Sequence, residues 1–132
     1  TNLMTLFICY SAFSQSEKEI ATDKIKTETV MISDDKSGIE TYRKESYTAY
    51  DQNGNTVEEI QYNDDGSIKE HKKYTYNASN LKTEETEYDA AGKLTKKTAY
   101  TYDAKGNKVS KVVTDGAGKT KQKKKYVYTY YE

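Results

Sequence analysis

Residues 50–75 read YDQNGNTVEEIQYNDDGSIKEHKKYT, and the same 26-residue pattern returns as YNASNLKTEETEYDAAGKLTKKTAYT at 76–101 and YDAKGNKVSKVVTDGAGKTKQKKKYV at 102–127. Each copy begins with Tyr followed by Asp or Asn, and each contains two turn signals at alternating spacings of 12 and 14 residues. Self-similarity at a fixed period indicates one small structural unit used repeatedly. This stretch therefore decides the fold.

Each turn signal consists of Asp or Asn, two variable residues, and then Gly or Asn. The first side chain opens a turn by accepting backbone N–H groups, and the last residue tolerates a positive φ. This pattern fits a type I turn that ends in a left-handed residue and a G1 bulge, which is a common three-residue hairpin loop. The predicted turn residues include Asp51, Gly54, Gly66, Asn80, Asp89, Gly92, Asp103, Gly106 and Gly118.

The runs between the turns are rich in Thr and Tyr, which favour strands, and a turn every 12 to 14 residues leaves little room for a helix. Hairpin turns make consecutive strands antiparallel. The sequence therefore predicts an all-β fold, an antiparallel meander of about eight strands joined by Asp-x-x-Gly hairpins. The expected strands are 24–33, 39–50, 55–62, 67–76, 81–88, 93–102, 107–114 and 119–130.

The composition limits how this sheet is packed. Leu, Ile, Val and Phe together are 19 of 132 residues, which is less than the fifth of a chain that a folded core usually needs. Disorder normally combines low hydrophobicity with high net charge and few aromatics, but this chain has no net charge and 14 tyrosines. We expect an extended, largely single-layer, twisted sheet; an open half-shell and a closed small barrel are the alternatives.

Nearly all tyrosines of the sheet region have even numbers. Side chains alternate between the two faces of a strand, and a three-residue loop pairs residues of equal parity. The pattern predicts that one face carries the tyrosines and offers a possible ligand-binding surface formed by Tyr74, Tyr76, Tyr88, Tyr100, Tyr102, Tyr126 and Tyr128.

The same register predicts specific neighbours. Tyr62 should lie opposite Ile68, and Tyr88 opposite Leu94. Lys73, Glu85 and Lys97 should form a charge ladder on the other face. Further expected pairs are Tyr74 with Thr56 and Glu84, Tyr100 with Lys82, and His71 with Glu59 and Glu87.

Few residues suggest catalysis or metal binding. The chain has one His and one Cys, which excludes a Cys/His metal site or an internal disulfide framework. His71 lacks a nucleophile motif around it, and a flat sheet offers no cleft that would shift carboxyl pKa values. We expect no enzyme activity, no catalytic residue, no bound metal and no cofactor. The lysines near the last expected strand could contact an anionic group, but protection of a sheet edge is the favoured interpretation for Lys119, Lys121, Lys123, Lys124 and Lys125.

The first residues differ from the rest of the chain. Residues 3–12 are mostly apolar, and Ala12, Phe13 and Ser14 resemble a small-x-small cleavage site. We interpret residues 1–14 as a truncated secretory signal peptide, residues 15–23 as a flexible lead-in, and residues 24–132 as the β-sheet domain. This arrangement predicts a protein that is secreted or lies in a bacterial cell envelope, in the periplasm or on the outer surface.

Tyr50-Asp51, Tyr88-Asp89 and Tyr102-Asp103, each followed by two residues and Gly, resemble the YD repeats of RHS proteins. The resemblance covers residues 50–128. In those repeats Arg-Leu commonly follows the Gly, whereas this chain has pairs such as Asn55-Thr56 and Lys93-Leu94. The resemblance implies strand-turn architecture and an exported, surface or interaction role.

Together these features predict a non-enzymatic structural or protein-interaction module. A carbohydrate-binding module that uses the tyrosine-rich face is the alternative. The expected partner is a protein or a glycan at the cell surface. The balanced charge gives no indication of nucleic-acid binding, and no run reaches the roughly 18 apolar residues of a membrane helix.

Overall fold

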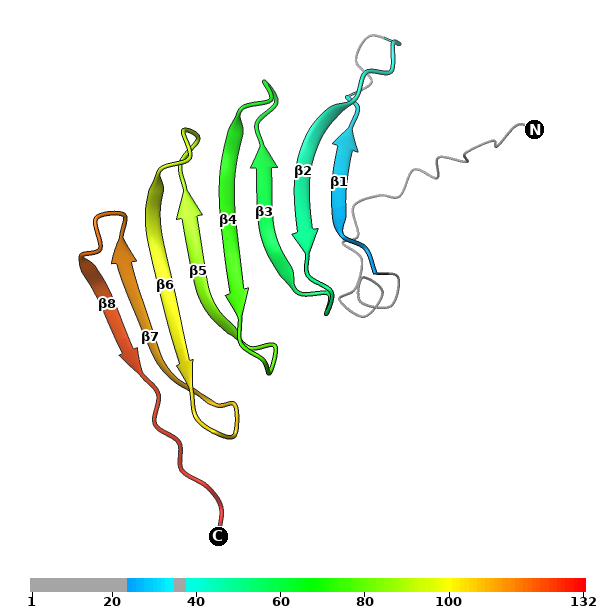
Figure 1. Ribbon diagram of the computed structural model, residues 1–132. Coiled ribbons are helices and arrows are strands. Elements are labelled where there is room, and N and C mark those ends of the chain that lie inside the picture. Colours follow the sequence, from blue (N-terminus) through cyan, green and yellow to red (C-terminus); the bar gives the residue numbers. More distant parts are fainter. Residues whose placement is uncertain (1–23, 35–37) are drawn as a thin grey trace.

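The computed structural model describes residues 24–34 and 38–132, and it confirms the predicted antiparallel meander. Eight strands form one sheet in sequence order, as Figure 1 shows. The expected signal peptide, the lead-in and part of the first expected turn lie outside the described residues. The strands are β1 (Thr27–Ile32), β2 (Arg43–Tyr50), β3 (Thr56–Tyr62), β4 (Ile68–Tyr76), β5 (Lys82–Tyr88), β6 (Leu94–Tyr102), β7 (Lys108–Asp115) and β8 (Thr120–Lys125).

The sheet is open. Among the described strands, β1 pairs with β2 alone and β8 pairs with β7 alone, so the closed-barrel alternative is wrong. Within the described part of the chain, no side chain is fully buried, and Thr86 and Thr98 are the buried polar residues. The strands are therefore held by backbone ladders and cross-strand side-chain pairs rather than by an apolar core.

The predicted loop geometry is confirmed at the six hairpins from β2 to β8. In one of these loops the N–H of Gly106 donates to the carbonyl of Asp103 at 3.0 Å, and the N–H of Asp103 donates to Asn107 at 2.9 Å. The Asp103 Oδ1 atom also accepts the N–H groups of Lys105 and Asn107, both at 2.9 Å. The residues with positive φ that close these loops are Gly54, Gly66, Asn80, Gly92, Gly106 and Gly118.

Each strand pair contains a further irregularity that the sequence analysis did not predict. The register shifts by one residue close to the loop in every pair. Between β4 and β5, for example, Tyr76 faces Lys82 but Thr75 faces Glu84, so Thr83 is an extra residue. Such a bulge reverses the relation between residue number and sheet face. Even positions in β4 therefore share a face with odd positions in most of β5.

The predicted single tyrosine face is consequently wrong for tyrosines at the ends of β3 and β5. Tyr88 lies opposite His71, and the centroids of the two rings are 5.1 Å apart. Tyr100 lies opposite Lys111 and projects from the other face. The pairs of Tyr62 with Ile68 and of Tyr88 with Leu94 are confirmed, because they lie between the loop and the bulge.

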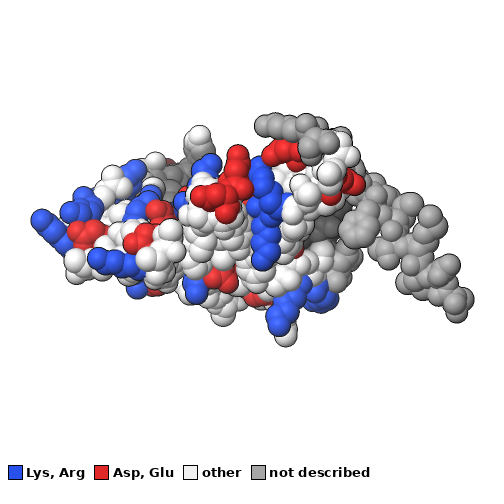
Figure 2. All heavy atoms as spheres, turned by 90° about the horizontal axis from the view of Figure 1, so that it is seen from above, with Lys and Arg blue, Asp and Glu red and all other residues white. Residues whose placement is uncertain are grey.

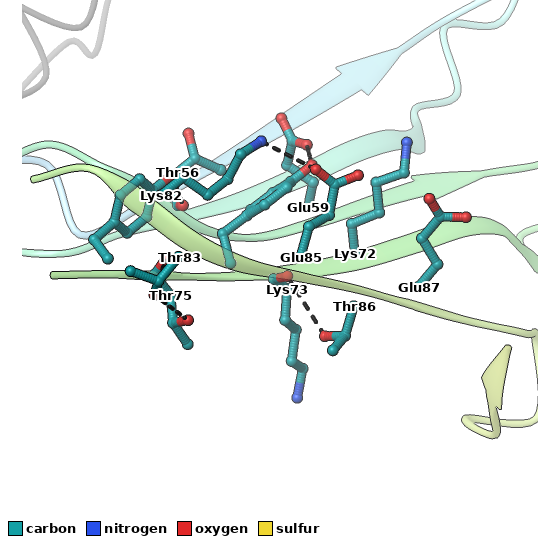
Figure 3. Close-up of polar contacts among 12 residues, drawn as sticks. Thr56, Glu59, Lys72, Lys73, Thr75, Lys82, Thr83, Glu85, Thr86 and Glu87 are labelled. Atoms are coloured by element: carbon teal, nitrogen blue, oxygen red, sulfur yellow. Dashed lines mark hydrogen bonds and ion pairs between the residues drawn. The ribbon is translucent and has the colours of Figure 1, made fainter. Parts of the chain in front are cut away.

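The predicted charge ladder is wrong for the same reason. Lys73 faces Thr86, and Thr86 faces Lys97, while Glu85 lies between Tyr74 and Thr98. Figure 3 shows Lys73 and Thr86 on one side of the sheet and Glu85 on the other. The expected pairs of Tyr74 with Glu84 and of Tyr100 with Lys82 are also wrong.

The register can be tested by the coupling energy between charged side chains. The Lys97 ammonium lies 2.6 Å from a Glu84 carboxylate oxygen, whereas Glu85 is on the other face. A double-mutant cycle with Glu84→Ala and Lys97→Ala, measured by urea unfolding, should give about 0.2–1 kcal/mol of coupling. The matched cycle with Glu85→Ala and Lys97→Ala should give almost none. Stronger coupling of Lys97 to Glu85 would contradict the register described here.

Candidate functional site

The candidate site is the sheet face that carries most of the tyrosines, which we call the tyrosine face. Of the seven tyrosines predicted to form a binding surface, six share this face and Tyr88 lies on the opposite one. Every strand from β2 to β8 contributes side chains to the tyrosine face, but its tyrosines come from β2, β4, β6 and the residues just after β8. Its tyrosines are Tyr50, Tyr74, Tyr76, Tyr100, Tyr102, Tyr126 and Tyr128.

Three tyrosine hydroxyls connect neighbouring strands through backbone carbonyls. Tyr76 donates to the carbonyl of Thr56 at 2.7 Å, and Tyr102 donates to that of Lys82 at 2.5 Å. Tyr128 donates to the Lys108 carbonyl at 2.7 Å. Tyr76 and Tyr102 end their strands and Tyr128 follows β8, and each bonds to the start of the preceding strand, where no loop joins the two. The three hydroxyls therefore hold together the open ends of adjacent strands.

Lysine ammonium groups stand over the tyrosine rings. Lys108 lies 4.5 Å from the ring centroid of Tyr100, and Lys82 lies 4.8 Å from that of Tyr74. Lys82 and Lys111 also approach the Tyr100 ring, at 5.9 and 6.0 Å. A cation over an aromatic face is attracted by the ring quadrupole. These contacts place charged side chains where a stacking sugar ring would have to lie.

The phenol of Tyr74 stays protonated near neutral pH. Burial is the main reason that its pKa is raised far above the ordinary value, and its hydrogen bond to Glu59 at 2.5 Å acts in the same direction. Burial also raises the pKa values of Tyr100 and Tyr102.

The charged side chains in the middle of the tyrosine face pair with one another. The ammonium of Lys96 lies 2.8 Å from Glu87, and that of Lys82 lies 3.0 Å from Glu85. Lys82, Glu85 and Glu87 lie on the side of the sheet seen at the top of Figure 3. The hydrogen bond to Glu87 raises the pKa of Lys96, which favours its charged form. These ion pairs connect charged side chains across the middle of the tyrosine face.

His71 lies on the opposite face, and its partners differ from those predicted. Its Nε2 atom is 2.8 Å from Glu58, and its neighbours across the strands are Ile60 and Tyr88 rather than Glu59 and Glu87. The bulges between the loops and these pairs account for the difference. In residues 24–34 and 38–132, no group of three His, Cys, Asp or Glu side chains is arranged to hold a metal ion.

Gly116 is a packing residue that the sequence analysis missed. A Cβ atom at this position would lie 2.0 Å from the carbonyl oxygen of Leu94, so any side chain would force the backbone to move. Gly116 is a variable position of its turn, where other turns carry residues such as Asp64 and Ala90. Nothing in the local pattern distinguishes it from them, because the contact is made with the preceding hairpin.

No protein-family model matches the chain, and no curated protein matches it. Among the described residues, no helix has the length and apolar character needed to cross a membrane. The residues and their geometry therefore carry the functional argument.

Removal of one tethering hydroxyl should weaken the sheet. Tyr102→Phe keeps the ring but leaves the Lys82 carbonyl without its 2.5 Å donor. We expect the free energy of unfolding in urea to fall by about 0.5–1.5 kcal/mol. Tyr131→Phe is the matched control, because Tyr131 is fully exposed. Equal effects of the two substitutions would show that the tether contributes nothing.

Stability should fall at both ends of the pH range. The backbone N–H of Asn107 is the main reason that the pKa of Asp103 lies below 3.8, so the stabilisation by its carboxylate is complete above about pH 4 and is lost as the pH falls through the lowered pKa. Burial raises the pKa of Tyr102 above 10.0, so the stabilisation by the neutral phenol is present below pH 10 and is lost as the pH rises through the raised value. Urea midpoints measured across the pH range would show this profile.

Asp103→Asn provides the control for the acid side. Asn77 occupies the same turn position and accepts the N–H groups of Ser79 and Leu81 at 2.9 and 3.0 Å through a neutral oxygen. The substituted turn should therefore form, while the loss of stability below pH 4 becomes less steep. An unchanged slope would rule out Asp103 as a contributor.

Proposed function

We propose that the chain is a non-enzymatic structural and protein-interaction module of a secreted or cell-envelope bacterial protein. The observation that carries this proposal is the single-layer sheet, which exposes both faces and uses its polar side chains to hold its own strands together. Such a structure presents a large surface for its size. It suits extended contacts with another protein better than enclosure of a small substrate.

The electrostatics support a non-enzymatic role. A catalytic acid or base normally sits in a sheltered site that shifts its pKa toward the working pH. Here the carboxylates near the centre of the sheet pair with lysines, such as Glu84 with Lys97 and Glu87 with Lys96. Hydrogen bonds that close turns lower the pKa values of Asp65 and Asp103, and in Asp51 they outweigh burial, which acts in the opposite direction. The Lys121 ammonium is the main reason that the pKa of Asp115 is lowered. These groups are fixed as anions for a structural purpose.

The recurrence of contacts supports a repeat architecture of the YD type. The hydroxyls of Tyr76, Tyr102 and Tyr128 are spaced by 26 residues, and each bonds a carbonyl 20 residues earlier in the chain. The resemblance of Tyr50-Asp51 and Tyr102-Asp103 to YD repeats implies an exported protein. The apolar start of the sequence is consistent with export.

The carbohydrate-binding alternative rests on the six predicted binding residues that share the tyrosine face. Two observations make it the weaker proposal. Tyr76, Tyr102 and Tyr128 use their hydroxyls within the sheet, and lysines stand over the rings of Tyr74 and Tyr100. A sugar would have to displace these lysines before it could stack on the rings.

Location provides the first test of the proposed function. Fractionation of the producing cells should place the protein in the envelope or the medium. Mass spectrometry should find a mature N-terminus near Gln15, because residues 1–14 would be removed during export. Recovery of the protein from the cytoplasm with residues 1–14 retained would contradict the proposal.

A glycan array provides the second arm of that test. The proposal expects no saturable glycan binding by the wild-type chain. Binding that is lost in Tyr100→Ala but retained in Tyr88→Ala would favour the carbohydrate alternative, because these two tyrosines lie on opposite faces.

A further inference from the structure

In the part of the chain that the structure describes, no strand pairs with the outer edge of β8. The charge balance of β8 also differs from that of the interior strands that correspond to it. In β4, Lys72 has Glu59 opposite in β3 and Glu87 opposite in β5. In β6, Lys96 has Glu87 opposite in β5 and Asp115 opposite in β7. Each of these lysines therefore has a carboxylate opposite it on both sides.

In β8, Lys121 lies 3.1 Å from an Asp115 carboxylate oxygen, but the three lysines that follow it lack this balance. Lys124 occupies the position of Lys72 two repeats further on, but it faces another lysine, Lys111 in β7. Lys123 faces Val112, and Lys125 faces Ser110. Among residues 24–34 and 38–132, no ion pair involves Lys123, Lys124 or Lys125, and the whole strand is exposed. In Figure 2, basic side chains project at the left-hand end of the molecule, where Figure 1 places β8.

The backbone of this edge is also available. The N–H of Tyr126 donates to Val109 in β7 at 3.1 Å. Because successive residues of an antiparallel strand direct their N–H and carbonyl groups to opposite sides, those of Lys123 and Lys125 point away from β7. Residues 126–132 continue past the end of the strand and leave its outer edge uncovered (Figure 1).

We propose that the outer edge of β8 binds an extended acidic segment of a partner protein, which adds to the sheet as a ninth strand. The inference deepens the proposed function by naming the kind of partner. Edge addition supplies affinity through main-chain hydrogen bonds, while side chains supply specificity. The three unpaired lysines favour a strand with glutamates, and they disfavour pairing with a second β8 edge because like charges would then face each other.

The chain itself contains a segment of the required kind. β5, with the sequence KTEETEY at Lys82–Tyr88, lies beside β4 on the side that corresponds to the open side of β8. There Glu87 lies opposite Lys72, and Glu85 lies opposite Tyr74. Lys124 and Tyr126 occupy the positions of Lys72 and Tyr74 two repeats further on. A peptide with this sequence is therefore a suitable probe of the edge.

The test uses the intact chain and the synthetic peptide KTEETEY. NMR hydrogen exchange should show that the amides of Lys123 and Lys125 slow by about tenfold when the peptide saturates the edge, because their N–H groups acquire acceptors. A peptide with its three glutamates changed to glutamine should bind about tenfold more weakly. Fusion of the peptide to the C-terminus through a flexible Gly/Ser linker raises its effective concentration to about the millimolar range, so that weak binding is also detected.

Matched variants distinguish strand addition at β8 from nonspecific electrostatic attraction between the acidic peptide and the lysines of the chain. The triple variant Lys123→Gln, Lys124→Gln and Lys125→Gln should lose the binding, and it should keep its fold because these side chains are exposed. The triple control Lys26→Gln, Lys69→Gln and Lys93→Gln removes the same charge from exposed positions outside β8 and should bind as the wild type does.

Three outcomes would overturn the inference. The first is an unchanged hydrogen-exchange rate of the Lys123 and Lys125 amides, even in the fusion protein. The second is that a peptide N-methylated at alternate residues binds as tightly as the unmodified peptide. The third is binding of anionic lipid vesicles through these lysines without slower exchange of the two amides. None of them bears on whether the protein is exported, so failure of the edge inference and failure of the proposed location are distinguishable.

Discussion

The structure depends on the register of each hairpin, since no apolar core would correct a strand that slipped. The side-chain oxygen that opens a loop fixes this register: Asp103 accepts two backbone N–H groups, and Asn77 does the same with a neutral amide. The bulge beyond each loop then sets which face each side chain occupies. The tyrosine tethers and the lysine–glutamate pairs follow from that placement, because they require partners on the same face.

The strands, the loops and the left-handed loop positions could be predicted because Gly, Asn and Asp mark them chemically. The faces of Tyr62 and Tyr88 could not be predicted, because they depend on the bulges. The extra residues in the pairs from β2 to β8 are of three types, and none is a glycine or another residue that marks irregular backbone. These residues are Val57, Lys69, Thr83, Thr95, Val109 and Lys121. The pairs of Tyr62 and Tyr88 were predicted correctly because they precede the bulge.

The candidate site was predicted in part. Six of the seven tyrosines predicted to form it share one face, but no local sequence pattern indicates that hydroxyls would reach carbonyls of the preceding strand. Tyr102 and the Lys82 carbonyl become neighbours through the sheet and not through a local motif. The same applies to Gly116, whose constraint comes from the backbone of Leu94 in another hairpin. Contacts between repeats are thus the part of the structure that local sequence patterns do not reveal.

Strands that are neighbours in the sheet are also neighbours in the chain, from β1 to β8. The sheet can consequently assemble in the order in which its residues become available, one hairpin after another, with low contact order and without waiting for a distant segment. A chain that passes through a narrow translocation channel emerges in this order. The free energy of unfolding of such a sheet is close to a sum of terms from neighbouring strands. Unfolding therefore begins at the ends of the sheet rather than in its middle.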